Sequence, residues 1–480
     1  MEFQKEVKSG FKWTSLSMIG GSLLQFLQVV ILARLLDPAD FGVFALTLVF
    51  IRFCQPLVEL GFGAAIIQRQ ELRQIEISTL FWLNFLLGML FFFLLYAFSP
   101  WVADWMEAPI LSSLLPVIAL GFLIVPLGIQ PQAFLQKKFH FKSLTLVGLL
   151  SFAVDFLLSI GFALKGYGAW SLVAGYLGRL IINTVGMLWA GYAHMDLRPK
   201  FQFNVSESRG LIKFGLFETG SLLSNLAGPG IEKLIIGKLL GTTVLGVYAI
   251  IWDLITIPYG KVNPILTKVA FPLMSKFSDS EEELRKWYQL LFKGILLINI
   301  PIYAVLITFP TEVLQIGFGE QWVPGAYCLR LMGIYGLFRA LMHPGATLLL
   351  SLGKTNVSFL WNLIWLAGSL TVLIILLQYF PELNTIGVSY LLSLMLFYWI
   401  WIYLLVKHGK INWLFKLNLT GKYLAMTGAF LGFALFLYNK FFLNNYYYLG
   451  SVIIIFGVIY ALTVFTFERQ FLKNIGFGKR

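Results

Sequence analysis

The 480-residue sequence has little charge and few of the residues that redox and metal chemistry use. Only 12% of its residues are Asp, Glu, Lys or Arg, whereas soluble proteins average about 25%. Its two cysteines, Cys54 and Cys328, both lie in apolar stretches, which excludes a disulfide framework and a zinc-binding cysteine pattern. The four histidines are scattered and no phosphate-binding P-loop is present, so we expect no metal, nucleotide or other cofactor.

Long apolar runs dominate instead, with 58% hydrophobic residues and a mean hydropathy of +0.80. A helix needs about 20 residues to cross the hydrocarbon core of a bilayer. The runs are continuous rather than alternating, which favours helices over barrel strands. The sequence therefore predicts an all-α polytopic membrane protein with fourteen spans. These are 13–35, 41–66, 78–99, 110–134, 143–164, 168–190, 211–237, 244–272, 288–309, 324–350, 356–379, 385–406, 420–439 and 446–467.

Basic residues are distributed unequally between the two sides of these spans. When the sides are assigned by alternation, 23 basic residues fall on the side of the N-terminus and four on the other, namely Arg34, Lys165, Lys238 and Lys440. Cytoplasmic loops carry such an excess, so both termini are predicted in the cytoplasm. The net charge of +13 is spread over many loops. A nucleic-acid partner, which would need one concentrated basic region, is not expected.

An internal repeat divides the chain. The segment ARLLDPADFGVFAL, residues 33–46, aligns without a gap with GKLLGTTVLGVYAI, residues 237–250, and five of the fourteen positions are identical. Repeated halves with a site between them are a known plan for secondary transporters, although duplication for stability alone is the alternative. We predict an N-terminal six-helix lobe (1–191), a cytoplasmic linker (192–209), a C-terminal six-helix lobe (210–406), and two additional helices with a cytoplasmic tail (407–480).

Three local features of the region from 211 to 287 predict breaks or short elements. A tight turn is expected at residues 241–243, between the seventh and eighth spans. Gly228-Pro229-Gly230 is the strongest predicted interruption of a span, as a hinge or as a static bend. The polar segment 275–287 predicts a separate short cytoplasmic helix.

Several charged residues fall inside predicted spans, where a charge at the bilayer centre costs roughly 2.5–3.5 kcal/mol unless it is paired or hydrated. We predict that five bases line a cationic cavity between the lobes: Arg52, Arg179, Lys233, Lys261 and Arg339. For Arg179, an ion pair with Asp155 on the neighbouring span is the alternative. Possible coupling carboxylates are Asp155, Glu218 and Asp253.

Such a cavity suits an anionic substrate, because arginine binds phosphate through two parallel hydrogen bonds and lysine acts as a point charge. Four amides inside spans could donate hydrogen bonds to sugar hydroxyls or pair with backbone instead. These are Gln25, Gln28, Asn225 and Asn263.

The segment GLFETGSLLSNLAGPGIEKLIIGKLLGTTVLGVYAI, residues 215–250, together with ARLLDPADFGVFAL, resembles the Wzx-type flippases of O-antigen and exopolysaccharide repeat units. These belong to the multidrug/oligosaccharidyl-lipid/polysaccharide export superfamily, and Arg52 resembles a cavity arginine of the related lipid II flippase. The resemblance implies a V-shaped two-lobed fold in the bacterial cytoplasmic (inner) membrane. It implies transfer of undecaprenyl-pyrophosphate-linked oligosaccharide between leaflets by alternating access. The implied partners are a polyprenyl-pyrophosphate-linked glycan, membrane lipid and polysaccharide polymerase machinery.

Two other classes of function are weighed against this one. A cation-coupled multidrug exporter of the same superfamily would favour carboxylates over bases in its spans, because its substrates are cationic. A membrane enzyme such as a polysaccharide polymerase would need a sizeable outer loop with catalytic groups. The longest outer loops, 100–109 and 310–323, carry only carboxylates. We therefore expect a transporter rather than an enzyme.

Overall fold

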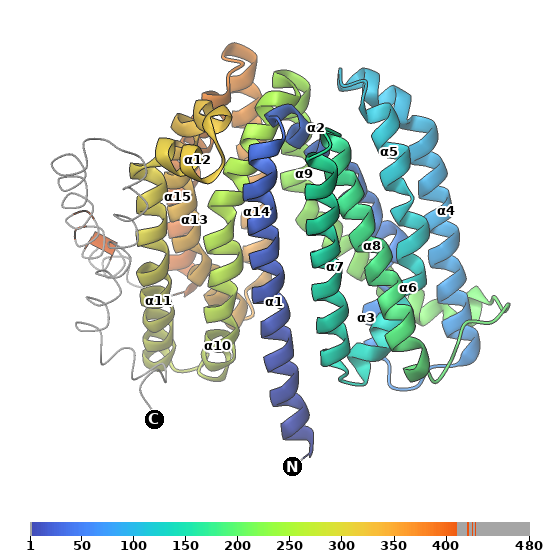
Figure 1. Ribbon diagram of the computed structural model, residues 1–480. Coiled ribbons are helices and arrows are strands. Elements are labelled where there is room, and N and C mark those ends of the chain that lie inside the picture. The colour runs from blue at the N-terminus through green and yellow to red at the C-terminus, as the bar shows by residue number, and fades with distance from the viewer. Residues whose placement is uncertain (1, 410–419, 422–424, 426–427, 429–480) are drawn as a thin grey trace. The chain divides into compact units, whose positions relative to one another are not determined.

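The computed structural model describes residues 2–409 and positions 420, 421, 425 and 428 (Figure 1). In these residues all regular structure is helical, as predicted, and the chain separates into two compact units, Met1–Gly246 and a second that begins at Val247. Ten helical stretches of the described chain are long and apolar enough to cross a membrane, which makes this a multi-pass membrane protein.

The first unit is built from one short 3₁₀ turn and nine helices, the last of which continues into the second unit. Their bounds are α1 Glu2–Leu35, α2 Pro38–Glu59, α3 Phe62–Gln68, α4 Gln74–Trp105, α5 Leu111–Ala119, α6 Gly121–Lys137, α7 Phe141–Ala163, α8 Ala169–Gly191, η1 Tyr192–His194 and α9 Val205–Ile257.

The second unit is built from the end of α9 and the elements that follow it. Their bounds are η2 Pro258–Val262, α10 Asn263–Lys276, α11 Glu281–Thr308, α12 Pro310–Gly317, η3 Glu320–Gly325, α13 Ala326–Ser351, α14 Thr355–Tyr379 and α15 Leu383–Gly409.

Each predicted span that ends before residue 407 coincides with helical structure. Two of them contain a break: 41–66 bends at Leu60 and Gly61, which adopt positive φ values of 46° and 59°, and 110–134 breaks at Leu120 between α5 and α6. The predicted span 446–467 lies outside the described residues, and of the span 420–439 only positions 420, 421, 425 and 428 are described. The count of fourteen and the lobe boundaries therefore stay predictions.

The interruptions around α9 differ from those expected. The turn predicted at 241–243 is confirmed, because Gly241 has φ 80° and ψ 174° and divides α9 into two helical parts. At Gly228-Pro229-Gly230 the helix continues, so no break is found there, and the alternatives of a hinge and a static bend stay predictions. An interior proline removes one backbone hydrogen bond, and this can bend a helix without ending it.

The separate cytoplasmic helix predicted over 275–287 is also not found. Instead α11 begins at Glu281 and runs without a break to Thr308. Its first turn carries Glu281, Glu282 and Glu283, and carboxylates are favourable at a helix N-terminus because they complement the macrodipole. The acidic run thus marks the start of a long helix.

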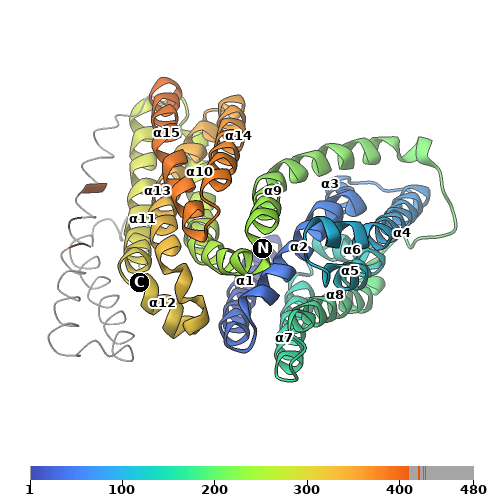
Figure 2. The same cartoon turned by 90° about the horizontal axis from the view of Figure 1, so that it is seen from above.

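The first part of α9 packs closely on α2 and α3 within the first unit (Figure 2). A Cβ added at Gly215 would overlap the carbonyl oxygen of Leu60, and one added at Gly230 would overlap the ring of Phe53. The Thr219 hydroxyl donates a hydrogen bond to the Pro56 carbonyl oxygen at 3.3 Å. Small residues that let helix backbones approach are the usual means of helix association in membranes.

The two copies of the repeat meet at Gly42 and Gly246, which occupy equivalent positions in them. A Cβ at Gly42 would overlap the carbonyl oxygen of Thr242, and a Cβ at Gly246 would overlap that of Pro38. Pro38 and Thr242 are themselves equivalent in the repeat, so the contact is reciprocal. The shared glycine is explained by a backbone-to-backbone crossing that leaves no space for a side chain.

This crossing predicts that Gly42→Ala and Gly246→Ala each lower stability by about 1–3 kcal/mol, because the added methyl meets backbone that cannot move aside. The matched control is Gly161→Ala, where a Cβ would meet nothing within 4 Å. Thermal unfolding of the purified protein in detergent measures the difference. Unchanged melting temperatures for both variants would contradict the crossing.

Candidate substrate site

A π-helix carries Lys261 in the second unit. Residues Pro258–Val262 form this wide turn between α9 and α10, and the side chain of Lys261 is exposed on it. π-helical turns are rare and often mark functional sites, because they change the direction of side chains and release backbone groups. The sequence signal is the pair Pro258 and Pro264, which stand on either side of Lys261.

Buried hydrogen bonds hold both ends of this π-helix. The hydroxyl of Tyr303 on α11 donates to the Ile255 carbonyl oxygen at 2.6 Å. Asn263 Nδ2 donates to the carbonyl oxygen of Ala340 at 3.2 Å, and Asn299 Nδ2 donates to Asn263 Oδ1 at 2.8 Å. Asn263 is therefore occupied by protein partners, and it positions the backbone beside Lys261.

Arg339 lies on α13 directly before Ala340, the residue that binds Asn263. Its guanidinium carbon is 5.5 Å from the centre of the Trp365 ring, which favours a cation on its face. Asn263 thus connects the segment that carries Lys261 to the helix that carries Arg339. Within the second unit, the backbone segments that carry Lys261 and Arg339 are thus joined by the hydrogen bond between Asn263 and Ala340.

Arg52 is exposed on α2 in the first unit. Further along the same helix, Gln55 donates a hydrogen bond to Glu59 Oε1 at 2.7 Å. Glu59 therefore has a neutral partner. Gln55 was missed from the sequence, although its four-residue spacing from Glu59 is the signal for such a bond.

Arg179 and Asp155 form the predicted ion pair, with 3.6 Å between Nη1 and Oδ2. Gln28 Nε2 donates to Asp155 Oδ1 at 2.8 Å and to Ser159 Oγ at 2.9 Å, which fills the other side of the carboxylate. The guanidinium carbon of Arg179 also lies 5.4 Å from the centre of the Tyr176 ring. Asp155 is thus the centre of a buried polar network, in which Gln28 serves the protein itself.

The remaining predicted residues lie along α9. Lys233 is half-buried next to the buried Glu232, and both make contacts in the structure. Glu218 is half-buried against Gly61, and Asp253 is exposed in the part of α9 that belongs to the second unit. Arg52, Arg179 and Lys233 thus lie in the first unit, Lys261 and Arg339 in the second, and a shared cavity stays a prediction.

An exposed ion pair lies at the end of the first unit that the charge pattern assigns to the outer side. Lys238 Nζ is 2.7 Å from Glu107 Oε1, which links the turn after α4 to α9. This hydrogen bond and the charge of Lys238 lower the pKa of Glu107. The pair is therefore intact above the usual glutamate pKa and is lost as the pH falls through the lowered one.

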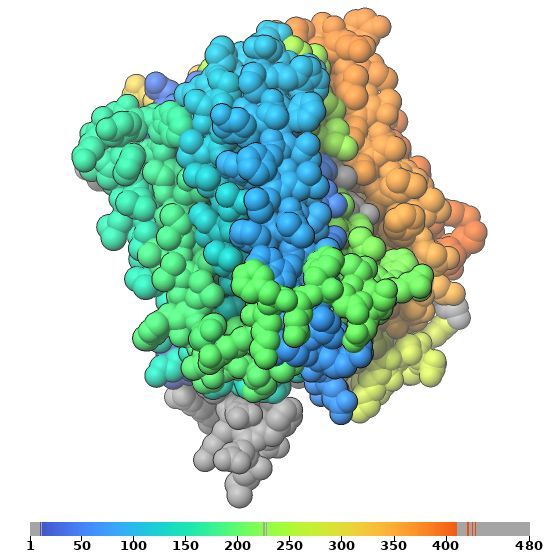
Figure 3. All heavy atoms as spheres, turned by 90° about the vertical axis from the view of Figure 1, so that its right-hand side faces the viewer, coloured from blue at the N-terminus to red at the C-terminus, as the bar shows by residue number. Residues whose placement is uncertain are grey.

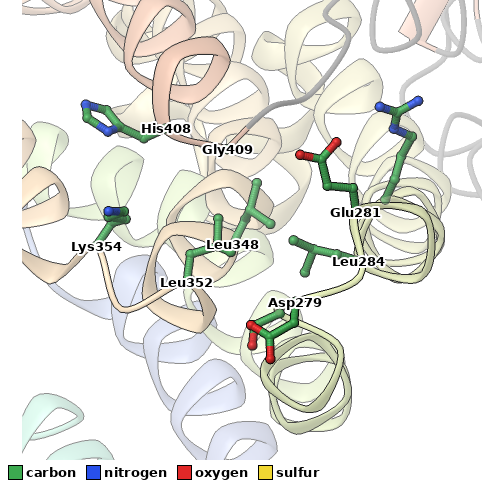
Figure 4. A pocket seen from close by; sticks show the side chains of 10 residues that line it. Asp279, Glu281, Leu284, Leu348, Leu352, Lys354, His408 and Gly409 are labelled. Atoms are coloured by element: carbon green, nitrogen blue, oxygen red, sulfur yellow. The ribbon is translucent and has the colours of Figure 1, made fainter.

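A pocket of about 270 Å³ lies at the ends of α11, α13 and α15 in the second unit. Figure 4 shows Asp279 and Glu281 on one side, Lys354 and His408 on the other, and leucine side chains between them. Asp279 and Glu281 share its wall with the basic side chains of Arg285, Lys354 and His408. None of the predicted site residues lines it.

The chain was compared with known protein families and curated proteins. Residues 31–326 match the family described as polysaccharide biosynthesis protein. The chain is 31% identical over 360 residues to the teichuronic acid biosynthesis protein TuaB of Bacillus subtilis (strain 168). The aligned region covers 75% of this chain and 74% of TuaB. The chain is also 28% identical over 362 residues to the lipopolysaccharide biosynthesis protein WzxC of Escherichia coli (strain K12), covering 75% and 73%.

Among solved structures, the lipid II flippase MurJ in an inward closed conformation resembles this chain with a TM-score of 0.73. The likeness covers 96% of this chain and 99% of that one, at 13% sequence identity. At this identity the likeness concerns the fold alone, and the V-shaped two-lobed arrangement that the resemblance implied stays a prediction.

The Asp155 network predicts a clear double-mutant result. Arg179→Gln alone and Asp155→Asn alone should each destabilise by up to about 3 kcal/mol, because each leaves the partner's charge without its counter-ion. The partial exposure of Arg179 reduces the loss through solvent screening. The double variant should lose clearly less than the sum, as measured by thermal unfolding in detergent.

The matched control for this cycle is Lys286→Gln, which removes an exposed ion pair with Glu283 and should change little. Strict additivity of the two single variants would contradict a coupled pair.

Proposed function

The chain belongs to the polysaccharide biosynthesis protein family, and on that premise we propose that it is a flippase for polyprenyl-pyrophosphate-linked oligosaccharides. The observation that carries the proposal is the combination of this family with a MurJ-like helical fold. The substrate would be an undecaprenyl-pyrophosphate-linked repeat unit, moved between leaflets by alternating access. The membrane would be the bacterial cytoplasmic membrane, with both termini in the cytoplasm, as the 23-to-4 distribution of basic residues favours.

The pyrophosphate is the part of such a substrate that needs the protein most. It carries negative charge that cannot enter hydrocarbon unpaired, whereas the polyprenyl tail can remain in lipid. Exposed Arg52 and Lys261, together with Arg339 on Trp365, would provide the opposite charges. Arg179 has a smaller part, because Asp155 already neutralises it.

The three carboxylates proposed for coupling also differ in how far the protein already occupies them. Asp155 accepts hydrogen bonds from Gln28 and Ser159 and pairs with Arg179, so its carboxylate is already occupied by protein partners. Glu218 and Asp253 remain the candidates for proton uptake during the cycle. Polysaccharide polymerase machinery would receive the flipped substrate on the outer side.

A cation-coupled multidrug exporter is the second candidate, since that class belongs to the same superfamily. The curated relatives favour the flippase, because TuaB and WzxC are both polysaccharide biosynthesis proteins. The bases on η2 and α13 also favour an anionic substrate over a cationic drug. Ethidium efflux by cells that express the chain would favour the exporter.

We predict that Lys261→Gln and Arg339→Gln each reduce flipping on the order of tenfold or more. A charge-assisted hydrogen bond to phosphate contributes about 1.5–3 kcal/mol, and neutral glutamine loses most of it. The measurement is the rate at which purified protein in proteoliposomes exposes an undecaprenyl-pyrophosphate-linked oligosaccharide on the opposite leaflet.

The matched control is Arg330→Gln on the same helix as Arg339. Arg330 is exposed and donates to the Ile307 carbonyl oxygen at 3.2 Å, so this variant should flip at the wild-type rate. Wild-type flipping rates for both test variants, at equal amounts of folded protein, would contradict the proposal that Lys261 and Arg339 bind the substrate.

A further inference from the structure

Residues 195–204, which we call the strap, connect η1 to α9 and are not helical. From the sequence alone, this stretch was predicted only as part of the cytoplasmic linker 192–209. In the structure it lies along the outside of α4, and Figure 3 shows it in green across the blue surface of that helix.

Side chains on one face of α4 fix the backbone of the strap. The Trp82 indole donates to the Lys200 carbonyl oxygen at 2.9 Å, and the Ser78 hydroxyl accepts from the Lys200 amide at 3.0 Å. The Thr79 hydroxyl accepts from the Asn204 amide at 2.9 Å, and Gln74 donates to the Arg198 carbonyl oxygen. The strap is therefore ordered in advance, and its own side chains are left to point elsewhere.

Those side chains expose rings to the surroundings. Phe201 is 93% exposed although one face of its ring lies 4.9 Å from that of Trp82, measured between centroids. Phe203 is 52% exposed, and Tyr192 and Val205 at the two ends are also exposed. Aromatic rings held in this way, close to polar groups, are typical of segments at the boundary between headgroups and acyl chains.

The strap also carries uncompensated positive charge. The two acids of this region are already paired, Asp196 with Lys138 at 2.6 Å and Glu207 with Arg73 at 3.1 Å. Arg198 and Lys200 are exposed, and no carboxylate of the described chain lies within ion-pair distance of either. The guanidinium carbon of Arg198 lies 4.1 Å from the centre of the Tyr192 ring, which holds this cation beside an aromatic surface.

We propose that the strap binds the headgroups of anionic phospholipids in the leaflet on the side of the N-terminus. Exposed rings enter the boundary region of the leaflet, while Arg198 and Lys200 contact lipid phosphates. A soluble acidic partner would explain the cations but not the exposed phenylalanines. The proposal concerns anchoring in the membrane and does not depend on the transported substrate.

The test uses the full-length protein in phosphatidylcholine vesicles that contain a small share of a photoactivatable phosphatidylglycerol. Cross-linked lipid is quantified on the peptide that contains residues 195–204. Labelling should be strong, and excess unlabelled phosphatidylglycerol should compete while phosphatidylcholine does not. The variant Arg198→Gln/Lys200→Gln/Phe201→Ser should reduce it on the order of tenfold, since each cation near an anionic surface changes affinity by about fivefold.

The control variant Lys165→Gln/Phe380→Ser removes an exposed cation and an exposed ring away from the strap, and should leave this labelling unchanged. Lys200→Gln alone should lower it by about fivefold, because α4 binds only the backbone of Lys200 and the strap remains in place. Equal labelling by a phosphatidylcholine probe, or wild-type labelling of both test variants, would overturn the proposal. A change in the oligomeric state of the triple variant, measured by light scattering, would also overturn the proposal, because the strap would then contact a second copy of the protein.

Discussion

A polar group inside a bilayer has no water to bind, and this constraint explains most of what the described residues do. Each backbone carbonyl and amide must find a partner within the protein, which leaves helices as the ordinary solution. Where a helix deviates, a side chain takes over. Tyr303 donates to the carbonyl oxygen of Ile255 beside the π-helix. Asn263 donates to the carbonyl oxygen of Ala340 on α13 and accepts from Asn299.

Charges obey the same constraint, and the structure separates two ways of satisfying it. Arg179 is satisfied by protein alone, through Asp155 and two aromatic rings. Arg52 and Lys261 have exposed side chains in membrane-spanning stretches, where a charge that faced lipid would be costly. An exposed charge inside a span is tolerated when water or an anionic ligand reaches it. This is the physical reason why we propose these residues for a substrate that carries a pyrophosphate.

Local sequence properties were sufficient for part of the fold. Apolar length predicted the helices, and the polar turn after Leu240 predicted the break at Gly241, since both depend on adjacent residues. The π-helix depends on Tyr303, 48 positions after the carbonyl it binds. The strap depends on Trp82, 118 positions before Lys200. Features stabilised by such distant partners have no local signature, and Gly228-Pro229-Gly230 shows the converse, a strong local signature without a break.

The repeat illustrates how a weak pattern in the sequence acquires a physical meaning. Five identities in fourteen apolar-biased positions carry little weight by themselves. In the structure, the identical pair Gly42 and Gly246 stands where each added Cβ would strike the backbone of the other copy. Two related surfaces that meet reciprocally must both satisfy the same steric limit, as in a two-fold interface between identical subunits. At this position of the repeat any added side chain would therefore meet the backbone of the other copy, which restricts both glycines in the same way.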